Sequence, residues 1–226
     1  MEENENKQEI SVSTEELKNE TVDTVKQVKE TIKNVNVKEE AKATKGFVTE
    51  MLKNPLDKIK EIANDYTNKY FKTAIVLVII WAVAALLGAI SFKYFTWSYF
   101  GKTLLSYVKT ILAPVLGVVV MSLIIFVMNK KSKKSLITVL TTITAVKLPV
   151  IAARVISLLT IISNNASVIT SRISSLCSVI STVFLYFAIR DLYAEEDEKV
   201  TLKNFVIIEA IYLVASLVIS YLGIYI

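Results

Sequence analysis

The chain has 226 residues, 53% hydrophobic and 21% charged. It has no histidine and one cysteine (Cys177), which excludes an internal disulfide and argues against a Cys/His zinc or haem site, so no cofactor or metal is expected. Residues 1–72 carry 13 basic and 15 acidic residues, whereas the apolar residues 73–226 carry 13 basic and 6 acidic ones. Because the excess basic charge flanks apolar segments, it indicates the lipid bilayer, and not nucleic acid, as a partner.

Residues 1–45 form a charged N-terminal tail in which apolar residues recur at three- and four-residue steps. These residues are Leu17, Val22, Val25, Val28, Ile32 and Val35. The spacing places them on one side of a helix. We expect a cytoplasmic tail that is partly helical or disordered on its own. The alternative is a helix that docks on a protein partner through residues 1–45.

Residues 46–72 form an amphipathic juxtamembrane segment. Its apolar side consists of Phe47, Met51, Leu52, Leu56, Ile59, Ile62, Tyr66 and Tyr70. The dipeptide Asn54-Pro55 predicts the start of a helix, since proline fits the first turn. We expect this helix to lie along the membrane surface. The alternative is a helix packed on a soluble partner.

Residues 73–226 are predicted to form about five transmembrane helices, because their apolar runs match a hydrocarbon layer of about 30 Å. The predicted spans are residues 73–95, 105–128, 136–162, 168–189 and 204–226. No internal repeat is visible, so a transporter built from paired repeats gains no support. The predicted fold class is therefore an all-α integral membrane protein.

The distribution of lysine and arginine predicts the orientation, since cytoplasmic loops are richer in both. If the tail is inside, the inner side carries Lys53, Lys58, Lys60, Lys69, Lys72, Lys130, Lys131, Lys133, Lys134, Arg190, Lys199 and Lys203. The outer side then carries only Lys93, Lys102, Lys109 and Arg172. We therefore predict a cytoplasmic N-terminus and an outside C-terminus. The many Lys, Ile and Asn residues and few glycines are typical of an AT-rich bacterial gene, which suggests a bacterial plasma membrane.

Three charged residues fall within the predicted spans: Lys147 and Arg154 in the third and Glu209 in the fifth. Lys147 and Arg154 are seven residues apart, so they share a helix face at a separation of about 10 Å. Charges inside a bilayer are costly, which makes these residues candidates for a functional site. Pro149 predicts a kink beside Lys147. We interpret this region either as a structural Lys147–Glu209 ion pair or as part of a permeation pathway.

The fourth predicted span is rich in hydroxyl groups. Ser171, Ser175, Ser178 and Thr182 follow steps of four, three and four residues and form one polar stripe. Small residues let helices approach closely, so we interpret the stripe as a helix-packing face, and a homo-oligomer is an open alternative. A nucleophilic serine is not expected, because histidine is absent and no general base is evident.

The layout resembles the Yip1-like membrane proteins, particularly their bacterial branch, over residues 46–226. The resemblance rests on Asn54-Pro55-Leu56 before the spans, Lys147-Leu148-Pro149 inside the third span, and a charged hairpin between the fourth and fifth. It implies a five-span membrane domain. In eukaryotes the family implies membrane trafficking and contacts with small GTPases, and the tail here carries no motif for that contact.

Two functions are compatible with these features. The first is a non-enzymatic multi-pass membrane protein that organises or recruits partners through its tail, favoured by the helical stripe and the lack of a catalytic set. The second is a small transporter or channel that uses Lys147, Arg154 and Glu209.

Overall fold

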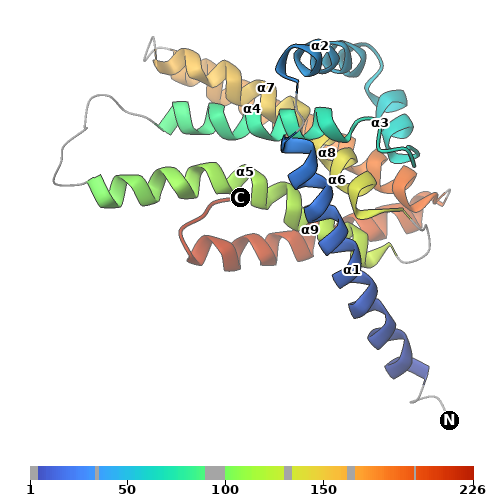
Figure 1. The fold of residues 1–226 in the computed structure, drawn as a ribbon. Coiled ribbons are helices and arrows are strands. Elements are labelled where there is room, and N and C mark those ends of the chain that lie inside the picture. Colours follow the sequence, from blue (N-terminus) through green and yellow to red (C-terminus); the bar gives the residue numbers. More distant parts are fainter. Residues whose placement is uncertain (1–4, 34–35, 90–99, 130–133, 162–165, 196) are drawn as a thin grey trace.

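The computed structural model describes residues 5–33, 36–89, 100–129, 134–161, 166–195 and 197–226 (Figure 1). These residues form α-helices and one short 3-10 helix, and no strand occurs among them. The helices are α1 (Glu5–Lys33), α2 (Val37–Lys53), α3 (Pro55–Ala63), α4 (Phe71–Ala89), α5 (Phe100–Met128), α6 (Leu136–Val146), α7 (Leu148–Ser157), η3 (Leu158–Ile161), α8 (Ala166–Tyr193) and α9 (Glu198–Tyr221). The predicted all-α class is confirmed.

Four of the helices are long and apolar enough to cross a membrane: α4, Leu104–Met128 of α5, Ser167–Tyr193 of α8, and α9. The bent pair α6–α7 passes the same test as a pair, so it is either a broken fifth span or a re-entrant loop. The chain is therefore an integral membrane protein, and each predicted span overlaps one of these helices or the bent pair. Residues 90–95 of the first predicted span and residue 162 of the third lie outside the described residues.

The fifth span differs from its prediction at both ends. It was expected over residues 204–226, but α9 begins at Glu198, where the Asp197 side chain accepts a hydrogen bond from the Lys199 amide. The helix ends at Tyr221, and Gly223 adopts a positive φ of 74°. Glycine adopts this conformation without steric cost, which lets the chain turn back toward α5.

The helix α6 lies at the centre of one half of the bundle. All its residues except Leu140 are buried, and they pack against α3, α4, α5 and α8. Its buried threonine hydroxyls donate to carbonyls one turn earlier, for example Thr142 Oγ1 to the Thr138 oxygen at 2.8 Å. This satisfies polar groups that would otherwise be costly to bury.

A bend of 47° separates α6 from α7 and confirms the kink predicted from Pro149. Proline lacks the amide hydrogen that would bond to the Ala145 carbonyl, so α6 ends at Val146 and the next helix starts at Leu148. Beyond the bend, α7 leaves the centre and packs against α4 and α8. Since α4–α5, α5–α9 and α9–α8 are also neighbours, five helices enclose the other half of the bundle.

The predicted amphipathic segment folds onto the bundle instead of lying only on the membrane surface. Phe47 and Met51 of α2 and Ile59 and Ile62 of α3 are buried in the same core as the transmembrane helices. Leu52 is exposed and remains available to the membrane surface. Asn54 and Pro55 stand at the N-cap and first position of α3, as predicted. We call this end of the bundle the α3 end and the opposite end the far end.

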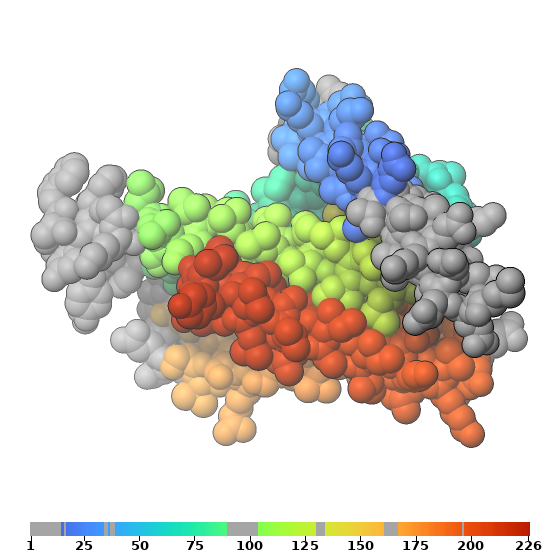
Figure 2. All heavy atoms as spheres, turned by 90° about the horizontal axis from the view of Figure 1, so that it is seen from below, coloured from blue at the N-terminus to red at the C-terminus, as the bar shows by residue number. Residues whose placement is uncertain are grey.

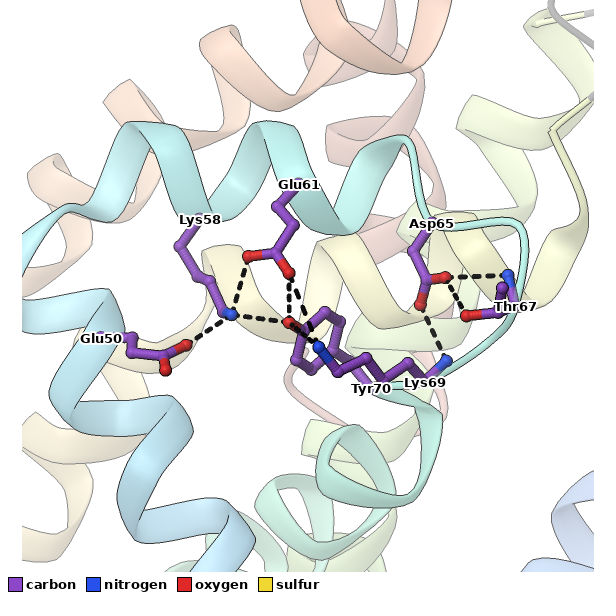
Figure 3. Close-up of polar contacts among 7 residues, drawn as sticks. All are labelled: Glu50, Lys58, Glu61, Asp65, Thr67, Lys69 and Tyr70. Atoms are coloured by element: carbon purple, nitrogen blue, oxygen red, sulfur yellow. Dashed lines mark hydrogen bonds and ion pairs between the residues drawn. The ribbon is translucent and has the colours of Figure 1, made fainter.

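A polar cluster joins α2, α3 and the start of α4 (Figure 3). The Lys58 ammonium lies 2.5 Å from a Glu50 oxygen, and it donates to Glu61 Oε2 at 2.8 Å and to the Tyr70 hydroxyl at 2.7 Å. Tyr70 in turn donates to the other Glu61 oxygen. Lys58 is only 6% exposed, and each of the three N–H groups of its ammonium has a partner within the cluster. We therefore interpret the cluster as a structural contact.

The tail is helical over the described part of α1, which extends away from the bundle toward the N-terminus (Figure 1). Val28 packs against Phe71, Ile75 and Ile137, so the second half of α1 is docked on the bundle. Val22, Val25 and Ile32, which belong to the predicted apolar stripe, remain exposed, and Val35 lies outside the described residues.

Candidate functional site

A cavity of about 620 Å³ occupies the far half of the bundle. It is enclosed by α4, α5, α7, α8 and α9 and by the segment that follows α9. On α5 it extends from Ser106 to Gly117, which corresponds to about 16 Å along the helix. Since the apolar part of α5 runs from Leu104 to Met128, the cavity reaches the middle of the membrane-spanning segment.

The cavity ends where α6 begins to fill the bundle. Ile143 of α6 is fully buried in a core that includes Met121 and Ile125 of α5 and Leu185 and Ile189 of α8. This apolar core extends to the α3 end, where α3 covers it. The cavity therefore leads from the far end to a closed floor at the α6–α7 bend.

Lys147 lies at that floor and is the single residue between α6 and α7. The sequence suggests Glu209 of α9 as its ion-pair partner. The expected ion pair between them is absent, however, because no contact within 4.0 Å joins these two described residues. Glu209 belongs to α9 and does not line the cavity, and neither does Pro149, which acts through the bend.

Arg154 lies on the same cavity wall, as the spacing from Lys147 predicts. Its Nη2 donates a long hydrogen bond of 3.4 Å to the Ala85 carbonyl of α4. A Cβ at Gly88 would be 3.5 Å from the same nitrogen, which is an ordinary van der Waals distance, so the guanidinium packs directly on α4 at this position. No carboxylate lies within ion-pair distance of Arg154 among the described residues.

Lys109 is the third basic residue of the cavity and lies nearer the far end. Its Nζ donates to the Leu222 carbonyl at 2.7 Å, which holds the segment after α9 beside α5. That segment enters the cavity, since the Ile226 Cβ lies 3.7 Å from the Cβ position of Gly117. Figure 2 shows α9 running along α5 on the surface of the molecule.

Hydroxyl groups complete the polar lining. Ser178, Ser181, Thr182 and Tyr212 all contribute to it. Ser181 is 2% exposed and its Oγ has no hydrogen-bond partner among the described residues. A buried hydroxyl without a partner is unfavourable, so Ser181 is a group that a ligand or water in the cavity would satisfy.

Only half of the predicted serine stripe reaches the cavity. Ser178 and Thr182 line it and Ser171 and Ser175 do not, although all four residues are exposed on α8. The hydroxyls of Ser175, Ser178 and Thr182 donate to carbonyls one turn earlier in their own helix. Packing of this stripe against a second chain stays a prediction.

The sequence did not reveal every residue of the cavity. Lys109 was assigned to an outer membrane flank, because a lysine near the end of a span commonly reaches the surface. Tyr212 and Ser181 were not singled out. Tyr212 lies three residues after Glu209, so the two residues are neighbours on one face of a helix. This spacing is the feature of the sequence that could have indicated Tyr212 as a site residue.

Comparisons with family models, curated proteins and solved structures found no match to this chain. The resemblance to Yip1-like proteins therefore stays a prediction from the sequence. The site itself is a cavity of about 620 Å³ inside the bundle of apolar helices, and its lining combines basic, hydroxyl and apolar side chains.

Proposed function

We propose that the chain is a small transporter or channel in which a hydrophilic solute enters the bundle from the far end and binds above Lys147. The observation that carries the proposal is the cavity that reaches the middle of the membrane span while Lys147 and Arg154 lie on its wall without a carboxylate ion pair. Charged groups at this depth are costly and mark solute pathways in membrane proteins.

The bend between α6 and α7 supports passage beyond the cavity. Broken helices line the binding sites of many transporters, because their unwound residues face a polar space. Here α6 closes the path toward the α3 end, so transport requires α6 to move relative to α7. Lys147 lies between the two helices and is the hinge residue in this proposal.

Solute release from liposomes tests the proposal. The full chain is reconstituted in phosphatidylcholine liposomes loaded with chloride, acetate, potassium or glycerol, and release is measured after dilution. We expect release of at least one solute above that of empty liposomes, and loss of this release in Lys147→Met. The matched control is Lys72→Met, because Lys72 is exposed at the start of α4 and does not line the cavity.

Two results would contradict the proposal. One is release no faster than from empty liposomes for all four solutes. The other is a folded Lys147→Met protein that releases solute at the wild-type rate. If Lys147→Met instead fails to fold and the added change Glu209→Gln restores folding, the two charges act structurally and the permeation role is rejected.

A second candidate function rests on the tail. Val22, Val25 and Ile32 are 47%, 60% and 54% exposed on α1. Three apolar side chains at helical spacing offer a surface for a partner helix, which supports a non-enzymatic protein that recruits partners, in keeping with the Yip1-like layout. Replacing all three by Gln should remove a partner captured by cross-linking in cells. An unchanged set of captured proteins would reject this function.

We also propose that the α3 end faces the cytoplasm of a bacterium and that the far end faces outward. The described basic residues at the α3 end outnumber those at the far end, which supports this orientation. Lys93 and the loop lysines 130–133 lie outside the described residues.

A further inference from the structure

We infer that the cavity selects anions, and that its ligand carries a carboxylate, phosphate or similar anionic group. This inference rests on the proposed function, because it names the class of solute that the same cavity accepts. It arises from the balance of charges on the cavity wall and from the lack of partners for those charges.

The wall carries positive charge at three depths. Lys109 lies nearer the far end, Arg154 follows on α7, and Lys147 lies at the floor. None of the described residues that line the cavity is Asp or Glu. Because a low-dielectric surrounding strengthens electrostatic interactions, three like charges around one space produce a strongly positive potential there.

The available protein contacts do not neutralise these charges. Arg154 has the Ala85 carbonyl at 3.4 Å, and Lys109 has the Leu222 carbonyl at 2.7 Å. For Lys147 no hydrogen bond occurs among the described residues, and Glu209 lies beyond ion-pair distance. Unpaired charges are unfavourable inside a bilayer because they lose their hydration. An anion or water in the cavity would compensate for this loss, which the protein's own contacts do not.

Neutral donors are also in place for an anion. The Ser181 hydroxyl is buried without a partner, and the Tyr212 hydroxyl lies 3.3 Å from the Cβ position of Gly117 on the cavity wall. Hydroxyl donors beside cationic side chains suit a group with two or more oxygen acceptors. A cation would meet three basic side chains and no Asp or Glu side chain among the described residues that line the cavity.

The anionic group has two sources: a small anion dissolved in water or the headgroup of an anionic lipid that enters from the membrane. Both present the same chemistry to Lys147 and Arg154. The experiment therefore includes one arm for each source.

The test measures the charge preference of the cavity through the reaction of a cysteine. Ser178→Cys is introduced together with Cys177→Ser, and the affinity tag is placed at the N-terminus because the segment after α9 enters the cavity. The protein is treated in phosphatidylcholine vesicles with a sulfonate-bearing or a trimethylammonium-bearing methanethiosulfonate. The ratio of the two rates is divided by the same ratio at Ser167→Cys, an exposed position on α8. Because the same thiol reacts in both cases, its own ionisation cancels.

We expect the normalised ratio to favour the anionic reagent by about tenfold or more. Arg154→Gln and Lys147→Gln should each lower it severalfold, and Lys109→Gln, at the mouth, provides the same comparison if the deeper variants fail to fold. Soluble acetate or phosphate should slow the anionic reagent if the ligand is a free anion. Phosphatidylglycerol in the vesicles should slow it, after normalisation to Ser167→Cys, if the ligand is a lipid headgroup.

A normalised ratio near one, or one that favours the cationic reagent, would overturn the inference. No reaction at Ser178→Cys with either reagent would overturn it as well, because an anion could not then enter. No slowing by any of these anions would also count against it. If liposomes release solute but the normalised ratio is near one, the anion preference is rejected and the transport function stands. If the ratio is high but no solute is released, transport is rejected and the cavity is an anion-binding site.

Discussion

The Arg154 guanidinium lies against the main chain of α4, with Nη2 3.4 Å from the Ala85 carbonyl and the Gly88 Cβ position 3.5 Å away. Sixty-six residues separate Gly88 from Arg154 in the sequence, so this contact ties the first membrane span to the bent third one. The cavity wall at this level is therefore formed where Arg154 packs on α4.

Gly88→Leu should displace Arg154 from α4. An alanine at this position makes an ordinary contact, and it also favours the helix, so Gly88→Ala should be neutral or slightly stabilising. A leucine has no room beyond its Cβ, and we expect destabilisation of about 1–3 kcal/mol. Thermal unfolding in detergent measures the difference. Gly46→Leu is the control, because nothing lies within 4 Å of its Cβ position. Equal stability of Gly88→Ala and Gly88→Leu would contradict this contact.

Gly117→Ala should crowd the hydroxyl of Tyr212, which would lie 3.3 Å from the new methyl group. Tyr212→Phe removes that oxygen, so the alanine should be tolerated in the Tyr212→Phe background. A double-mutant cycle should give a coupling free energy of about 1 kcal/mol. The same effect of Gly117→Ala in both backgrounds would show that the two residues do not meet in the cavity.

Lys58→Met should loosen α2 and α3 from the bundle. The change leaves Glu50 without its Lys58 partner and Glu61 with only the longer 3.9 Å contact to Lys69, and we expect a loss of about 2 kcal/mol in the free energy of unfolding. Because both carboxylates are about half exposed, water limits the loss. Lys53→Met is the matched control, since Lys53 is exposed and no ion pair of the described residues includes it. Equal losses in the two variants would contradict a specific role for Lys58.

The same cluster should give the α3 end a pH dependence. Burial alone would lower the pKa of Lys58, but hydrogen bonds with Glu50, Glu61 and Tyr70 outweigh it and raise the pKa. The hydrogen bond from Lys58 is the main cause that lowers the pKa of Glu61. A raised lysine pKa stabilises the fold below the ordinary lysine pKa, and this stability is lost as pH rises through the raised value. A lowered glutamate pKa stabilises the fold above the ordinary glutamate pKa, and this stability is lost as pH falls through the lowered value.

Hydrogen exchange of α2 and α3 between about pH 3 and pH 7 measures the acid side of this dependence. In the wild type, protection from exchange should decrease as the pH is lowered. Lys58→Met should remove the part of this decrease that is due to protonation of Glu61. Asp65 should keep its own share, because hydrogen bonds from Thr67 and the Lys69 amide hold its pKa below the ordinary value against the effect of burial. An identical acid dependence in the wild type and Lys58→Met would contradict the assignment to Glu61.

Much of the fold could be predicted because its signals are local. Span length follows from unbroken apolar runs, and the bend beside Lys147 follows from the missing amide hydrogen of Pro149. The start of α3 follows from Asn54 and Pro55 in the same way. Each of these features depends on residues within one or two turns.

The arrangement of the helices could not be predicted from the same signals. Both α6 and α9 are mainly apolar, yet α6 is buried while Leu213, Leu217 and Val218 of α9 are exposed. In a membrane both lipid and protein interior are apolar, so hydrophobicity does not distinguish them. The contacts of Arg154 with α4 and of Lys109 with Leu222 join distant segments, and no local pattern indicated either.

Two neighbouring residues of α8 provide the most direct test of the cavity. Ser178 lines it, whereas Val179 is 61% exposed on the outer surface of the helix, where lipid would surround it. In chains that carry Cys177→Ser, a cysteine at each position is treated in intact cells with a membrane-impermeant maleimide, which reacts only with thiols that reach water. We predict that Ser178→Cys reacts and that Val179→Cys does not. Reaction at both positions or at neither would contradict a water-accessible cavity that opens at the far end.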